Sequence, residues 1–121
     1  MRTLVRSRVT NRLLQDIVER LVEIARPEKI VLFGSRARGD NRPDSDIDLL
    51  VIASSDEPRH IRSRAMYAAL SDIRVSTDIV VYTPEEVYDW SEVWQALVTS
   101  ALREGRVLYE RSSREANKDA H

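Results

Sequence analysis

The sequence predicts an α/β fold of the α+β kind, in which a small mixed β-sheet is flanked by helices. Three short apolar runs, at residues 29–33, 46–52 and 77–83, are bounded by turn-forming or polar residues, as is typical of buried strands. Apolar residues recur at helical spacing before the first run and between the second and the third. The 121 residues are enough for one hydrophobic core and too few for two, so we expect residues 1–121 to form a single domain.

The first helix is predicted to run from Asn11 to the residue before Pro27. Thr10 or Asn11 can cap its start, and Pro27 ends it. Its apolar stripe is expected to be core: Leu13, Leu14, Ile17, Val18, Leu21, Val22 and Ala25. Its charged positions are expected to face water: Asp16, Glu19, Arg20 and Glu23. The basic residues 1–10 before it are expected to be a solvated, flexible arm, and contact with a partner or nucleic acid is the alternative.

A glycine–serine turn, Gly34-Ser35, follows the first predicted strand. Glycine lets the backbone approach a ligand closely. The next residues, Ser35 to Arg38, are predicted to make one helical turn whose free N–H groups would face an anion. Arg36 and Arg38 either add positive charge to such a site or are ordinary surface arginines.

The second and third predicted strands both begin with acidic residues. Asp46 and Asp48 project from the same side of their strand because successive side chains alternate. Asp78 opens the third strand, and because neighbouring strands lie about 4.8 Å apart, the three acids can share a pair of metal ions. Like charges this close raise each other's pKa unless a cation lies between them, and magnesium prefers carboxylate oxygens. This pattern, one loop after the glycine–serine turn, indicates a site for a nucleoside triphosphate with its metal ions.

The remaining elements are predicted from helix signals and one short apolar run. A helix is expected from Pro58 to about Asp72, with these residues inside: Ile61, Ala65, Ala68, Ala69 and Leu70. Its basic residues are expected to form a solvated face: Arg59, His60, Arg62 and Arg64. Further helices are predicted over residues 84–90 and 91–104, then a short edge strand over 106–109 and a frayed polar tail over 111–121.

Composition excludes several classes of protein. The net charge of −1 excludes strong binding of nucleic acid through the overall charge of the molecule. The lack of cysteine excludes disulfides and thiolate metal sites. Lys29 and Lys118 are the only lysines, and no Gly-Lys-Ser/Thr sequence is present, which argues against a P-loop ATPase. No apolar run is long enough for a membrane span and no signal-peptide pattern opens the chain, so a cytoplasmic location is expected.

The spacing Gly34-Ser35, ten residues, then Asp46-x-Asp48 resembles the signature of the DNA polymerase β-like nucleotidyltransferase superfamily, and within it the minimal nucleotidyltransferase (MNT) proteins. The resemblance implies that Gly34 and Ser35 hold a triphosphate. It also implies that Asp46, Asp48 and a third acid, matched by Asp78, hold two Mg²⁺ ions and carry the catalysis. Arg36 and Arg38 are then candidates for nucleotide binding.

The same resemblance implies an activity and a partner. MNT proteins are commonly paired with a HEPN-domain ribonuclease toxin, and members act as antitoxins by transferring AMP from ATP to a toxin tyrosine. Two alternatives stay open: a non-catalytic module that inhibits the toxin by occlusion, and a dimeric adenylyltransferase that modifies a small molecule such as an antibiotic. An acceptor site contributed by another chain implies a homo- or hetero-oligomer.

Overall fold

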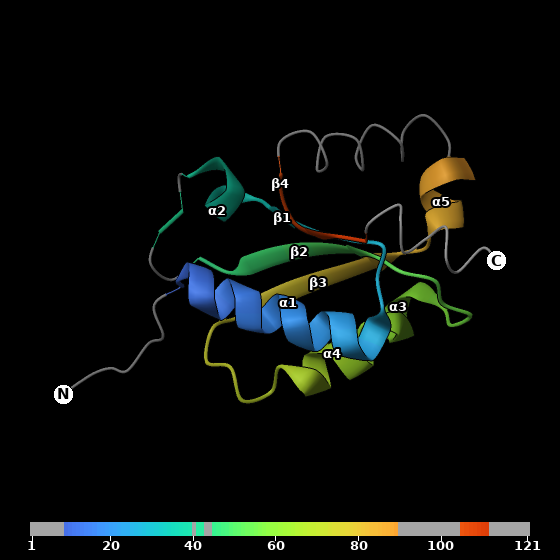
Figure 1. Cartoon of the computed structure of the whole chain (residues 1–121), viewed down its shortest axis with the longest axis horizontal. Helices are drawn as coiled ribbons and strands as arrows, with labels where there is room; N and C mark the ends of the chain where they lie inside the picture. The colour runs from blue at the N-terminus through green and yellow to red at the C-terminus, as the bar shows by residue number, and fades with distance from the viewer. Residues whose placement is uncertain (1–8, 40, 43–44, 90–104, 112–121) are drawn as a thin grey trace.

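A four-stranded mixed sheet forms the centre of the protein in the computed structural model, which describes residues 9–39, 41–42, 45–89 and 105–111 (Figure 1). The strand order is β3-β2-β1-β4. The bounds are Lys29–Phe33 for β1, Ile47–Ile52 for β2, Thr77–Tyr82 for β3 and Arg106–Glu110 for β4. β2 and β3 run parallel, whereas β1 pairs antiparallel with both β2 and β4. The predicted mixed sheet is therefore confirmed, and so is the edge strand near residue 106.

The first helix, α1 (Asn11–Ala25), begins and ends where the sequence predicts. The Thr10 hydroxyl oxygen accepts a hydrogen bond from the Leu13 N–H at 3.1 Å, which caps the first turn. At the other end Arg26 adopts a left-handed conformation with φ of 48°, and Pro27 follows. The apolar stripe of α1 packs against the sheet, with Ile17 and Leu21 fully buried.

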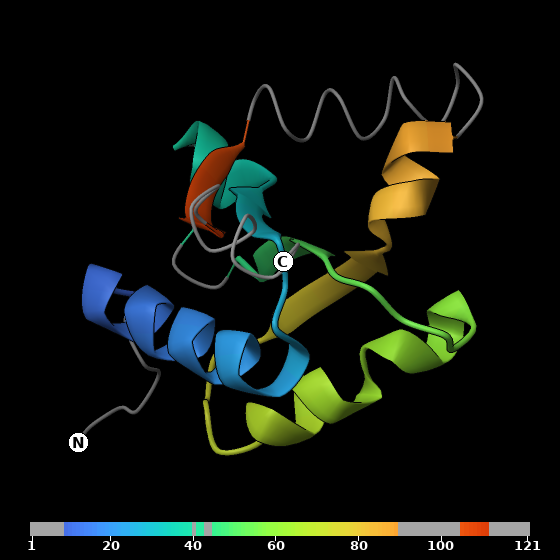
Figure 2. The same ribbon diagram turned by 45° about the vertical axis from the view of Figure 1, so that its right-hand side comes forward.

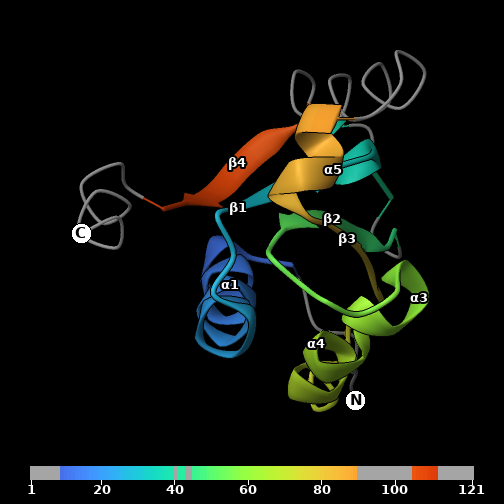
Figure 3. The same cartoon turned by 90° about the vertical axis from the view of Figure 1, so that its right-hand side faces the viewer.

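The two faces of the sheet are covered differently. α1 and α4 (Arg64–Ala69) lie on one face, as Figures 2 and 3 show. The larger core cluster lies between them and the sheet, and its strand residues alternate along β2 and β3: Ile47, Leu49, Val51, Ile79 and Val81. On the opposite face, where α5 (Pro84–Asp89) lies, a smaller cluster joins Val31, Leu50 and Tyr82. The acidic residues of β2 and β3 alternate with the first set, so they belong to this second face.

The helix predicted over residues 58–72 is wrong as a single element. The structure contains two short helices instead, α3 (Arg59–Arg62) and α4, joined at Ser63 with φ of −87° and ψ of −5°. Because the break resets the rotation of the chain, the inner side differs in part from the predicted one. Leu70 is buried as predicted, but Met66 is buried as well, and Ala65 and Ala68, which were predicted inside, are exposed.

Two arginines expected to be solvated are tied into the fold. Arg20 of α1 donates to the backbone oxygen of Ala69 at 3.0 Å and also pairs with Asp72, so it joins α1 to the end of α4. Arg62 of α3 is only 10% exposed in its side chain and pairs with Glu86 of α5 at 2.6 Å. The prediction of a water-facing side chain was wrong for Arg62. Arg20, with 31% of its side chain exposed, still faces water in part, although its guanidinium finds acceptors on a second element.

Several predicted segments lie outside the described residues, namely the helix over 91–104, most of the basic arm and all but the first residue of the polar tail. The described part of the preceding helix, α5, agrees with the prediction. In the part of the chain that the structure describes, no helix has the length and apolar character needed to cross a membrane.

Candidate active site

Two of the predicted acids meet across the β2–β3 pair. In the parallel register of these strands Asp48 lies directly opposite Asp78, and on the other side Asp48 pairs with Phe33 of β1. Residues opposite each other on neighbouring strands, about 4.8 Å apart, point to the same face of the sheet. The structure therefore brings Asp48 and Asp78 side by side, at the end of the sheet where both strands begin.

Asp46 lies just before β2 and completes a group of like charges. Asp46 and Asp78 are exposed, whereas Asp48 is half-buried. The pKa of the Asp48 carboxyl is raised above its ordinary value, first by burial and then by the negative charges of Asp78 and Asp46. The nearby positive charges of Arg36 and Arg38 act in the opposite direction and lower this pKa. The three acids are thus close enough to act on one another.

Gly34 leaves room for the Asp48 carboxylate. Gly34 has φ of 75°, a conformation that residues with a side chain rarely adopt. A Cβ atom added at Gly34 would collide with Oδ2 of Asp48 and would lie 3.2 Å from its Cγ. Glycine is therefore required here for two reasons, the backbone conformation and the space that the carboxylate occupies.

The turn continues into the short helix α2 (Ser35–Arg38), as predicted. The N–H groups of Ala37 and Arg38 both donate to the Gly34 oxygen at 3.1 Å. Arg36 donates through Nε and Nη2 to the backbone oxygen of Ser45, at 3.1 and 2.5 Å. This oxygen belongs to the peptide group that precedes Asp46, so Arg36 connects the glycine–serine turn to the first acid.

The three carboxylates fit a hard divalent cation in donor type. All are oxygen ligands, burial and mutual repulsion penalise the charged form of Asp48, and the missing Cβ of Gly34 leaves the room that this carboxylate occupies. Among the described residues no three acidic or imidazole side chains already converge closely enough to hold a metal ion. Because like charges repel, carboxylates that share a cation are expected to stand further apart without it.

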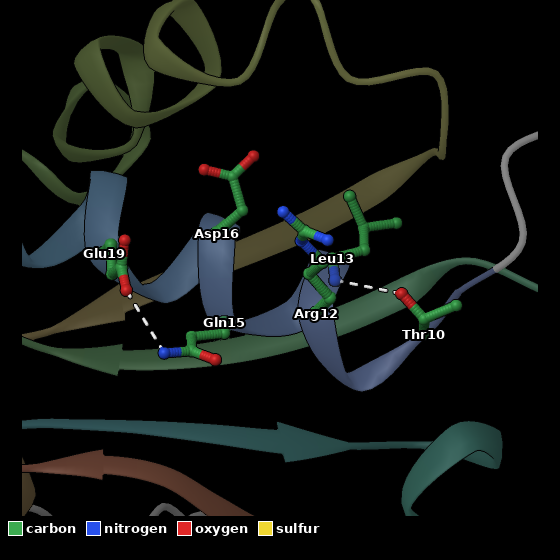
Figure 4. A pocket seen from close by; sticks show the side chains of 6 residues that line it. All are labelled: Thr10, Arg12, Leu13, Gln15, Asp16 and Glu19. Atoms are coloured by element: carbon green, nitrogen blue, oxygen red, sulfur yellow. Dashed lines mark hydrogen bonds between the residues drawn. The ribbon is translucent and has the colours of Figure 1, made fainter.

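A hollow elsewhere on the surface is unrelated to the acids. It lies along α1 and its cap and is lined by Thr10, Arg12, Leu13, Gln15, Asp16 and Glu19 (Figure 4). Gln15 and Glu19 hydrogen-bond to each other within it at 3.3 Å. It contains none of the predicted site residues, and its lining comes from a single helix, so we assign it no role in binding.

One contact next to the acids has no signal in the sequence. The hydroxyl oxygen of Tyr67, on α4, accepts a hydrogen bond from the N–H of Ile79 at 2.8 Å. Ile79 directly follows Asp78 on β3. A tyrosine in a short helix has many possible neighbours, and this one depends on how α4 packs against the sheet.

Known proteins resemble this chain in sequence. The family model described as polymerase beta, nucleotidyltransferase, matches residues 15–114. A protein of Methanocaldococcus jannaschii named as a putative protein adenylyltransferase is 33% identical over 84 residues, which cover 69% of this chain and 80% of the relative.

Solved structures share the fold. The crystal structure of a putative nucleotidyltransferase from Sulfolobus solfataricus superposes with a TM-score of 0.54 at 26% identity, covering 84% of this chain and 80% of that one. A mutant of the toxin–antitoxin pair MntA–HpeT gives a TM-score of 0.56 at 23% identity, covering 85% and 76%, a likeness that shows the fold alone. The fold predicted from the sequence is confirmed by these matches.

Proposed function

Because the chain belongs to the polymerase beta nucleotidyltransferase family, we propose that it is a magnesium-dependent adenylyltransferase that acts on a partner protein. In this proposal AMP passes from ATP to a tyrosine hydroxyl of a HEPN-type toxin, and the modification makes the chain an antitoxin. The observation that carries the proposal is the in-register pair Asp48 and Asp78, with Gly34 leaving space at the Asp48 carboxylate. The name of the 33% identical relative, a protein adenylyltransferase, favours AMP as the group transferred and a protein as the acceptor.

The chemistry assigns a role to each group of residues. Two Mg²⁺ ions held by Asp46, Asp48 and Asp78 would supply positive charge that favours an ionised acceptor and offsets the charge of pyrophosphate. Gly34 and Ser35 hold the β- and γ-phosphates through backbone N–H groups, which aligns the α-phosphate for in-line attack. Arg36 and Arg38 contribute positive charge near the Asp48 carboxylate.

The transfer step balances within this set of groups. The acceptor oxygen forms a bond to the α-phosphorus, the bond from that phosphorus to the oxygen bridging to the β-phosphate breaks, and pyrophosphate leaves. The carboxylate of Asp78 accepts the hydroxyl proton, and its exposed position lets an acceptor on another protein reach it. A tyrosine phenol suits the role of AMP acceptor, because its pKa of about 10 is well below that of an aliphatic hydroxyl and it loses its proton more readily.

Intact mass spectrometry of a HEPN-type partner tests the proposal. The partner is mixed with ATP, Mg²⁺ and either the wild-type chain or the double variant Asp46→Asn/Asp48→Asn. We expect the partner to gain one AMP with the wild type and none with the double variant. Asp56→Asn is the matched control, because Asp56 is an exposed acid outside the site, and it should modify the partner at the wild-type rate.

Other outcomes identify the alternatives. A partner that stays unmodified but is inhibited equally by the wild type and the double variant would show that the chain acts by occlusion. Transfer of AMP to an antibiotic or another small hydroxyl compound, with no transfer to the partner, would show that the chain is an adenylyltransferase of small molecules. Either result would overturn the proposal of protein adenylylation.

A further inference from the structure

Among the described residues, side chains rather than another strand occupy the outer edge of β3. On its inner side β3 pairs with β2 along its whole length. On its outer side the Ile79 N–H donates to the Tyr67 hydroxyl at 2.8 Å, and Arg62 donates to the Val81 oxygen at 3.3 Å. Just beyond the strand, the Thr83 N–H donates to Glu86 at 2.9 Å. Alternate residues along this edge are therefore bonded to α4, α3 and α5 in turn.

The hydrogen bond from Ile79 to Tyr67 is the one next to Asp78. The Ile79 N–H belongs to the peptide group that joins Asp78 to Ile79, so a partner for this N–H restrains the backbone that carries Asp78. Ile79 is 5% exposed and Tyr67 is exposed, so removing the hydroxyl leaves the N–H of a buried residue without its protein acceptor. Asp48 needs no such help, because β2 lies between β1 and β3 and is paired on both sides.

We propose that Tyr67 is a positioning residue whose hydroxyl fixes the backbone of Asp78, and so holds its carboxylate in register with that of Asp48. The inference rests on the proposed function, since it assigns Tyr67 to the metal and proton-accepting role of Asp78. A residue that only protects the edge of β3 from pairing with other chains would make the same hydrogen bond. The two roles differ in what happens at the acids when the hydroxyl is removed.

Calorimetric titration with Mn²⁺, used in place of Mg²⁺, tests the proposal on the full chain without an acceptor. We expect Tyr67→Phe to lower the affinity for Mn²⁺ about tenfold, the loss typical of a residue that orients a metal ligand. Tyr109→Phe is the matched control. The Tyr109 hydroxyl has no hydrogen-bond partner among the described residues, and its removal should leave the affinity unchanged.

The same titration in an Asp78→Asn background shows whether Tyr67 acts through Asp78. We expect Asp78→Asn to weaken Mn²⁺ binding and Tyr67→Phe to add no further loss, because the group that it positions is gone. A Tyr67→Phe variant that melts at a lower temperature but binds Mn²⁺ like the wild type would overturn the proposal and leave only edge protection. A loss of equal size in both backgrounds would overturn it too, since Tyr67 would then act through another group.

The failure of the proposed function gives a different result. Unchanged Mn²⁺ affinity in Asp78→Asn itself would remove Asp78 from the metal site, and both the proposed role of that acid and the role of Tyr67 would fall together. If Tyr67→Phe does not fold, amide hydrogen exchange of the wild type, with and without Mn²⁺, tests the proposal instead. Mn²⁺ should slow exchange of the Ile79 amide more than that of Val107 on β4, and equal effects at the two amides would contradict the proposal.

Discussion

The two ends of the β2–β3 pair carry opposite electrostatic arrangements. Where the strands begin, Asp46, Asp48 and Asp78 bring like charges together. Where β3 ends, Glu86 of α5 pairs with Arg62 of α3 at 2.6 Å and lies 3.5 Å from Arg59. We call the first group the acid end and the second, Arg59, Arg62 and Glu86, the clamp.

The pKa values of the two ends move in opposite directions. At the acid end, burial and neighbouring carboxylates raise the pKa of Asp48. At the clamp, burial alone would raise the pKa of Glu86, but hydrogen bonds from Arg62 and Thr83 and the charges of Arg62 and Arg59 outweigh it and hold that pKa at about 2. The clamp is satisfied by the chain's own residues, so its role is structural. The acid end needs positive charge from outside, which marks it as the place for a ligand.

Removing one acid should have the largest effect on activity and almost none on folding. We expect Asp48→Asn to lower the rate of AMP transfer by roughly 10³-fold or more, as is typical for a group that acts directly at the reacting atoms. In the absence of metal the variant should be as stable as the wild type, or more stable by up to about 1 kcal/mol, because a penalised charge is removed. Initial rates and urea unfolding in the presence of a chelator measure the two effects. Near-wild-type transfer would remove Asp48 from the catalytic group.

Breaking the clamp should do the reverse. Arg62→Met keeps the apolar length of the side chain but leaves the Glu86 carboxylate, 21% exposed, without its main partner. We expect the free energy of unfolding to fall by about 2 kcal/mol, as when a part-buried charged group loses a hydrogen-bonding partner. The double variant Arg62→Met/Glu86→Leu should regain most of this loss, because no part-buried carboxylate is then left without its partner. Urea unfolding decides the matter, and equal stability of Arg62→Met and the wild type would mean that the clamp contributes nothing.

The acid end could largely be predicted from the sequence, because its residues follow short patterns of glycine, serine and aspartate within or next to single strands. The β1 strand is bounded by a proline on one side and Gly34 on the other, and its predicted limits agree with the structure. The alternation of β2 predicts that Asp46 and Asp48 lie on one side, and Asp46 lies just before the strand. The register that sets Asp48 opposite Asp78 could not be predicted, because it depends on how the chain crosses from β2 to β3 through α3 and α4.

The clamp could not be predicted, because its partners are distant in the sequence. Arg62 occurs in a run of basic residues that is typical of a solvated face, and its acceptors, Val81 and Glu86, belong to later elements. Tyr67 was missed for the same reason. The break at Ser63 also has no proline or glycine to mark it. Local patterns therefore predicted the charged groups of the acid end, while the contacts that position them required the fold.

The smallest expected effect, the dependence of stability on pH, separates the two ends within one experiment. The folded-state pKa of Glu86 is about 2, below its ordinary value of 4.5, so its stabilisation is complete well above pH 4.5 and is lost as the pH falls toward 2. The pKa of Asp48 is raised above 3.8, so its penalty on folding is present at neutral pH and disappears as the pH falls to about 3.8. The stability advantage of Asp48→Asn over the wild type should therefore be nearly gone by about pH 4. The advantage of the wild type over Glu86→Gln should still keep most of its size there. Urea unfolding of the wild type, Asp48→Asn and Glu86→Gln from pH 7 to pH 3, without metal, measures both stability differences. If both stability differences became smaller over the same pH range, the two ends would not differ in the way proposed. The proposed difference is that like charges destabilise the acid end, whereas the charges of the clamp are paired.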